Sequence, residues 1–148
     1  MPAAEVPLAG TPPTAARVRH DLLTPINGII GYAGILLEDA ADLGRTEMQG
    51  PLEEIRSGAR EIADVVRQTL GVQLDAANLS AAVERVRDAC LRPARGLVAS
   101  AEWLRTEVTP PDDQALVHDL EQLAASARVL TALLEHAAEA PESSSAAR

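Results

Sequence analysis

The strongest constraint on the fold of this chain is an internal repeat. When the sequence is shifted so that His20 falls on Asp88, the two halves align without a gap and share eight identities over positions 17 to 36. Unrelated segments of this length should share about one or two at ordinary residue usage. We call the separation along the sequence between His20 and Asp88 the repeat interval. The same interval aligns, further along, Leu52-Glu53 with Leu120-Glu121 and Ala59-Arg60 with Ala127-Arg128. A structural unit is therefore duplicated within the chain.

Each unit has the apolar spacing of two amphipathic helices. In the first helix, expected from about Thr14 to Asp42, apolar residues recur at intervals of four, three, four and three: Leu22, Ile26, Ile29, Ala33 and Leu36. Similar stripes predict a second helix that fades after Leu70, a third that is stopped by the Pro-rich segment 109–113, and a fourth beyond it. Aromatic residues make up only 1% of the chain, so the core must consist of aliphatic side chains. That composition favours helix-on-helix packing over a sheet.

Local residues predict where the helices begin and end. Gly44 is expected to cap the first helix and Thr46 to N-cap the second, with Pro51 near its first turn. Asn78 or Ser80 is expected to cap the third helix.

The short connections make neighbouring helices antiparallel, which predicts an all-α fold: an antiparallel up-down-up-down four-helix bundle from two tandem helical hairpins. The hairpins are expected at 14–72 and 79–139, together forming one globular bundle over 14–139. One hairpin cannot bury both of its apolar faces, whereas two copies can bury them against each other. The chain therefore looks like a dimer fused into one polypeptide, and we expect a monomer. Residues 1–13, with four prolines, are expected to be a flexible leader, and 140–148 a disordered polar tail.

Charge and composition exclude several classes of function. The net charge is −9 and there is no basic cluster, which argues against nucleic acid and against an anionic membrane surface as partners. No stretch of about 18 apolar residues predicts a transmembrane helix, and the first residues lack the features of a secretory signal. The single cysteine cannot form an internal disulfide, so we expect a cytoplasmic protein. No spacing of metal ligands and no phosphate-binding loop occurs, so no metal site and no bound cofactor are expected.

The residues that carry chemistry lie in the segment 17–32. His20 and Thr24 are four residues apart and therefore project from the same side of the helix. His20 flanks the apolar stripe, so it should be accessible to solvent. A neutral imidazole has a free nitrogen lone pair that can attack a phosphoryl group. Asp21 can hold the N–H of the other ring nitrogen and so raise the nucleophilicity of the first.

A proline and several glycines shape the same helix. Pro25 lies in the interior, removes one backbone hydrogen bond and predicts a bend; its recurrence as Pro93 makes the bend a property of the repeated unit. Gly28, Gly31 and Gly34 form a face of small residues. If this face is exposed it offers a shallow docking surface, and if it is buried it allows close helix packing.

The run His20-Asp-Leu-Leu-Thr-Pro-Ile-Asn-Gly-Ile-Ile-Gly-Tyr32 resembles the phosphoacceptor box in the dimerisation and histidine-phosphoacceptor (DHp, HisKA-like) domain of sensor histidine kinases. The resemblance implies that His20 is the phosphorylated histidine and that Asp21 assists the transfer. It implies that Thr24 positions the water that dephosphorylates a response regulator in bifunctional members.

The chain departs from this family in two ways. It has no Gly-rich ATP-lid pattern, and the short segment after Ala138 cannot hold an ATP-binding domain, so we do not expect an autonomous histidine kinase. The second copy reads Asp88-Ala-Cys-Leu-Arg-Pro93, in which the histidine, the acid and the threonine are all replaced. That half resembles a degenerate phosphoacceptor.

The leading hypothesis is a histidine-phosphotransfer or phosphatase module of two-component signalling. Its expected partner is a response-regulator receiver domain, which would supply any Mg²⁺ and dock near Asn27, Gly28, Gly31 and the facing side of the second helix. A separate histidine kinase is a possible phosphoryl donor, and the direction of flow stays open. The alternative is a non-catalytic scaffold that binds and sequesters a signalling partner. A third possibility is a domain excised from a larger hybrid protein.

Other potentially reactive residues have plainer interpretations. His118 and His136 have no such context and are expected to be solvated or capping residues. Asp88 is expected to be a solvated acid, and Cys90, on an apolar stripe, a packing residue. Trp103 either fills the bundle or marks a contact surface.

Overall fold

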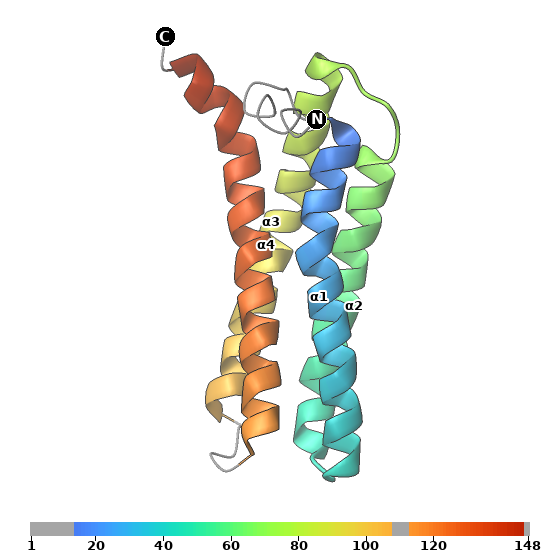
Figure 1. The fold of residues 1–148 in the computed structure, drawn as a ribbon, viewed down its shortest axis with the longest axis vertical. Helices are drawn as coiled ribbons and strands as arrows, with labels where there is room; N and C mark the ends of the chain where they lie inside the picture. Colours follow the sequence, from blue (N-terminus) through green and yellow to red (C-terminus); the bar gives the residue numbers. More distant parts are fainter. Residues whose placement is uncertain (1–13, 108–112, 147–148) are drawn as a thin grey trace, which may run out of the picture.

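Four helices make up the described part of the chain. The computed structural model describes residues 14–107 and 113–146, with side chains described as far as residue 137. The helices are α1 (Ala15–Asp42), α2 (Thr46–Leu70), α3 (Ala76–Glu107) and α4 (Gln114–Ala146), and this part contains no strand. Successive helices run in opposite directions along one long axis (Figure 1). The four-helix bundle predicted from the apolar stripes is therefore confirmed.

The helices pack in a closed order. α1 lies against α2 and α4, and α3 lies against α4 and α2, so α1 and α3 occupy opposite corners of the bundle. The contacts within each hairpin are the most extensive, and the contacts between hairpins pair α1 with α4 and α2 with α3. The two hairpins thus meet through equivalent surfaces.

Burial follows the repeat interval of the sequence. Buried residues that the repeat aligns are, on α1 and α3, Leu22 and Cys90, Ile26 and Ala94, Ile29 and Leu97, Ala33 and Ala101, and Leu36 and Leu104. On α2 and α4 they are Leu52 and Leu120, Ile55 and Leu123, Ala59 and Ala127, Ile62 and Leu130, and Val66 and Leu134. No polar or charged residue of the described part is buried. The core is therefore aliphatic, as the shortage of aromatic residues predicts.

The connection between α1 and α2 depends on Gly44. This residue has a φ of 70°, a left-handed conformation that glycine adopts without steric cost. Its N–H donates to the carbonyl of Ala41, and the N–H of Arg45 donates to the carbonyl of Ala40. These are the two hydrogen bonds of a Schellman motif, so Gly44 ends α1 as predicted. At the other end of α1, Thr14 Oγ1 accepts from the Arg17 N–H.

Two of the predicted caps are wrong. Arg45 occupies the N-cap position of α2 and makes no capping hydrogen bond through its side chain, so Thr46 is the first residue of the helix and Pro51 falls in its second turn. The cap of α3 is Asp75, whose Oδ1 accepts from the Asn78 N–H at 2.8 Å, and not Asn78 or Ser80. Aspartate caps as well as asparagine or serine. The two alanines that follow Asp75 are strong helix formers, so α3 begins one turn earlier than expected.

The carboxyl-terminal end also differs from the expectation. α4 continues to Ala146 and so passes through most of the segment 140–148 that was expected to be a disordered tail. The alanine-rich approach at residues 137–140 has high helix propensity and carries the helix past the last apolar stripe residue. The expected leader, 1–13, and most of the stop segment, 109–113, lie outside the described residues.

Candidate phosphoacceptor site on the first hairpin

The exposed side of α1 carries the residues that the sequence singled out. His20, Thr24, Asn27 and Gly31 are not buried and follow one another at intervals of four, three and four. On this spacing they lie on one side of the helix, opposite the buried stripe. His20 itself is exposed and therefore accessible to a partner, as predicted, although it lies opposite the apolar stripe and not beside it.

The hydroxyl of Thr24 is tied to the backbone of His20. Thr24 Oγ1 donates to the His20 carbonyl oxygen at 3.0 Å. The bond fixes the threonine side chain one helical turn from the imidazole and leaves the lone pairs of its oxygen free to accept a further hydrogen bond. The two side chains are thus presented together. Next to them, Pro25 is buried.

The carboxylate of Asp21 faces an arginine instead of the imidazole. Asp21 Oδ1 lies 3.6 Å from Arg17 Nε, and within the described residues Asp21 makes no hydrogen bond to His20. The side chains of Asp21 and Arg17 are 49% and 68% exposed, respectively. An exposed ion pair of this kind contributes about 0–1 kcal/mol, so little free energy opposes a change of partner.

The end of α1 that carries His20 is anchored to the end of α2. Arg19 Nη1 donates to the carbonyl oxygen of Leu70, the last residue of α2, at 2.6 Å. This satisfies one of the carbonyls left free at a helix C-terminus and places a cation at its negative end. The sequence pattern does not single out Arg19. In the sequence, the one sign of its importance is that a basic residue directly precedes the candidate nucleophile His20.

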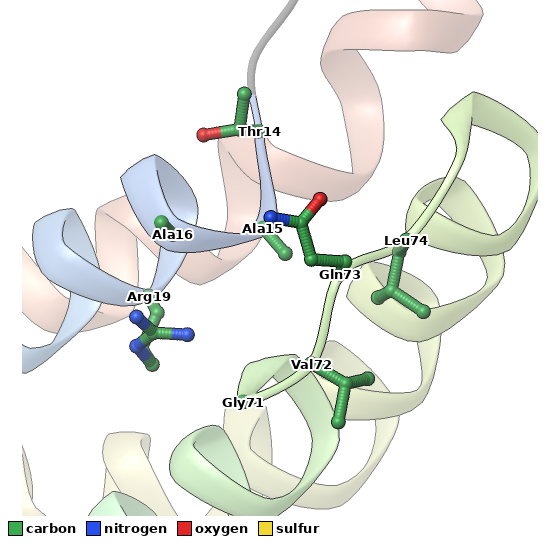
Figure 2. A pocket seen from close by; sticks show the side chains of 8 residues that line it. All are labelled: Thr14, Ala15, Ala16, Arg19, Gly71, Val72, Gln73 and Leu74. Atoms are coloured by element: carbon green, nitrogen blue, oxygen red, sulfur yellow. The ribbon is translucent and has the colours of Figure 1, made fainter.

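A cavity of about 360 Å³ opens beside this anchor (Figure 2). It lies between the first turn of α1 and the link that joins α2 to α3, and it is lined by Thr14, Ala15, Ala16, Arg19, Gly71, Val72, Gln73 and Leu74. His20 is not among its lining residues, so the imidazole faces open solvent.

The predicted partner-binding residues separate into two groups. A Cβ at Gly28 would lie 3.0 Å from Ser126 Oγ, so this glycine permits α4 to pack closely on α1. A Cβ at Gly31 or Gly34 would meet nothing within 4 Å. Gly28 is therefore a packing position, whereas Asn27 and Gly31 lie on the open side of α1.

The opposing residues of α2 can be identified from the second hairpin. There, Arg95 pairs with Glu135, and Glu102 pairs with Arg128. The repeat aligns Asn27 and Arg67 with the first of these pairs, and Gly34 and Arg60 with the second, so we infer that they face each other in the first hairpin. Both of these arginines are exposed. We call the surface formed by His20, Thr24, Asn27, Gly31, Gly34, Arg60 and Arg67 the first face.

The remaining candidate residues lie where their plainer interpretations place them. His118 and His136 lie outside the core on α4, and Asp88 is exposed and lies 3.4 Å from Arg87. Cys90 is buried, and burial raises the pKa of its thiol to about 11. Trp103 is 48% exposed and so does not fill the bundle. The described residues contain no cluster of three or more acidic, histidine or cysteine side chains that could hold a metal ion.

One known family matches the first hairpin. Residues 14–73 match the His Kinase A (phospho-acceptor) domain, a segment that spans α1 and α2. No match was found among curated proteins or among solved structures. The resemblance carried by the box at residues 17–32 is thereby confirmed over a whole hairpin. The match implies a histidine phosphoacceptor role in two-component signalling.

None of the described helices is long and apolar enough to cross a membrane.

Proposed function

We propose that this chain is a histidine-phosphotransfer or phosphatase module of two-component signalling, in which His20 exchanges a phosphoryl group with the aspartate of a receiver domain. One observation carries the proposal. His20 lies in the segment that matches the phosphoacceptor family, and it is exposed on the same side of α1 as Thr24, Asn27 and Gly31.

The transfer requires little from the protein beyond position and charge. In the direction towards His20, a lone pair of the neutral imidazole attacks the phosphorus of the aspartyl phosphate. A P–N bond forms, the P–O bond to the carboxylate breaks, and its electron pair leaves with the carboxylate. The proton on the other ring nitrogen stays or passes to solvent. Transfer in the other direction reverses each step, and the Mg²⁺ that offsets phosphoryl charge would be held by the receiver.

Asp21 assists by exchanging partners. Its carboxylate is exposed and only weakly held by Arg17, so rotation towards the imidazole N–H costs little. A carboxylate on that N–H orients the ring and stabilises the positive charge that develops on it during attack. Arg17 then faces solvent, or the phosphoryl group as it approaches.

Thr24 serves the phosphatase reaction. Its oxygen lies one turn from His20 and has lone pairs free to accept a hydrogen bond from water. A water molecule held there can attack the aspartyl phosphate of a docked receiver, with the P–O bond to aspartate breaking as before. The products are inorganic phosphate and the free carboxylate.

The second hairpin provides the rest of the scaffold. Its helices bury the apolar face that the first hairpin would otherwise expose, and Gly28 lets α4 approach α1 closely. The chain is in this proposal a pseudo-dimer in one polypeptide, active as a monomer with one reactive histidine.

The test is a phosphotransfer assay. The full chain is incubated with receiver domains carrying radiolabelled phosphate, and label on the chain and inorganic phosphate are measured over time. His20→Ala should abolish labelling, whereas His118→Ala, at a histidine outside the matched segment, should change neither labelling nor phosphate release. Asp21→Asn should slow labelling, and Thr24→Ala should slow phosphate release more than labelling.

Two results would contradict the proposal. Labelling that survives His20→Ala would remove this residue from the reaction. Receivers that bind equally well to the wild type and to His20→Ala, with no transfer and no phosphate release, would favour the scaffold alternative.

A further inference from the structure

The second hairpin has a face that corresponds, position by position, to the first face. On α3, the repeat aligns Arg95, Ala99 and Glu102 with Asn27, Gly31 and Gly34, respectively. On α4, it aligns Arg128 with Arg60 and Glu135 with Arg67. We call the surface formed by Arg95, Ala99, Glu102, Arg128 and Glu135 the second face.

Two ion pairs cross the second face and join its helices. Arg95 Nη2 donates to Glu135 Oε2 at 2.9 Å, and Arg128 donates to Glu102. Glu102 is also held by its own helix, where Arg105 Nη2 donates to Oε1 at 2.6 Å. The hydrogen bond from Arg105, followed by that from Arg128, lowers the pKa of Glu102 and keeps it ionised. All of these charges are therefore paired within the molecule.

The first face has no counterpart to these pairs. Gly34 supplies no side chain where Glu102 stands, and Asn27 is uncharged where Arg95 stands. Arg67 lies 3.9 Å from Asp64 of its own helix, and Arg60 has no ion pair within the described part of the chain. A partner that docks on the first face meets open space above Gly31 and Gly34. It also meets Arg60 and Arg67, neither of which forms an ion pair with a residue of α1.

A partner on the second face meets different conditions. Docking there would remove water from two ion pairs that are already satisfied, and burial of such pairs carries a desolvation penalty that their mutual attraction does not fully recover. The partner gains little charge complementarity, because a group that engages either arginine must first replace the glutamate already paired with it. The space left between α3 and α4 is an open hollow of about 310 Å³, and Arg95, Arg128 and Glu135 line it together with Val98, Ala99, Thr131 and Ala132.

We propose that Arg95, Glu102, Arg128 and Glu135 are specificity-determining residues that close the second face to receiver domains, so that each chain binds one receiver, through the first hairpin alone. This inference rests on the proposed function and adds to it. Loss of the histidine in the second copy removes a reactive group, whereas the ion pairs remove a binding surface that would otherwise hold receivers unproductively.

The experiment measures binding stoichiometry by titration calorimetry and light scattering, with a receiver that exchanges phosphate with His20. The wild type should bind one receiver per chain. Gly31→Arg, which places a long side chain on the first face, should abolish binding. The double variant Arg95→Asn/Glu102→Ala removes one partner from each ion pair and should bind two receivers. Combined with Gly31→Arg it should bind one, without transfer.

Controls keep the outcomes separate. Helical content and transfer at His20 in Arg95→Asn/Glu102→Ala show that the bundle is intact. Two receivers on the wild type, with normal transfer at His20, would overturn this inference and leave the proposed function standing. So would a folded, transfer-competent double variant that still binds one receiver. A chain that transfers phosphate to no receiver would overturn the proposed function, and this inference with it.

Discussion

Raising the pH from 9 to 11 should remove a stabilising contribution to the folded chain that comes from the side chain of Cys90. Its exposed fraction is 1%, and burial raises the pKa of the thiol from 9.0 to about 11. The folded state therefore keeps a proton that the unfolded state gives up. The stabilisation that the protonated Cys90 thiol gives to the folded state is fully present below pH 9, and it is lost as the pH rises towards 11. The difference between the two pKa values corresponds to a limiting loss of about 3 kcal/mol in the free energy of unfolding.

Composition makes this effect measurable. The chain contains no lysine, so no lysine side chain titrates in the same pH range as the thiol. Urea unfolding followed by circular dichroism at pH 7, 9, 10 and 11, under reducing conditions, gives the free energies. Cys90→Ala should be less stable than the wild type at pH 7 because of the cavity that it leaves.

The difference in the free energy of unfolding between the wild type and Cys90→Ala should then narrow between pH 9 and 11, since only the wild type has a thiol that becomes ionised on unfolding. All other titrating groups are common to both proteins and cancel in the difference. Parallel curves for the two proteins over this range would refute the argument. Rapid alkylation of native Cys90 at pH 8 would also refute it, because a buried thiol should react only after unfolding.

Three further predictions concern the fold. Leu36 and Leu104 are fully buried and related by the repeat, so replacement of either by alanine should lower the free energy of unfolding by about 2–5 kcal/mol. A negligible effect of either substitution in urea titrations would contradict equivalent packing of the two hairpins. Gly44→Ala should cost about 1–2 kcal/mol because φ is 70°, and a melting temperature no lower than that of the wild type would count against the Schellman turn. Asp75→Ala should cost about 0.5–2 kcal/mol in the same assay, whereas Asn78→Ala should cost less; the reverse order would restore Asn78 as the cap.

Much of the architecture could be predicted because it depends on periodicity. The spacing of Leu22, Ile26 and Ile29 determines which side of α1 is buried, and the same spacing at the aligned positions of the second unit does so for α3. Helix ends were less predictable. Thr46 and Asn78 are both suitable caps by residue type, but a residue earlier in the chain occupies the cap position in each case. Capping residues differ by only about 1 kcal/mol, less than the packing energy that sets where a helix begins.

The sequence alone determined the composition of the site: a histidine, an acid and a threonine on one hairpin, and their loss on the other. Residue identity and spacing along one helix suffice for that, because neighbours within a helix have known geometry. Only the tertiary structure decided which glycine packs and which stays open, since the answer for Gly28 depends on Ser126, which belongs to the other hairpin. It also decided that Arg95 and Glu102 reach across to α4, while Asp21 turns to Arg17. Charged side chains choose among several partners within a few ångströms, and that choice is made by the arrangement of whole helices in space.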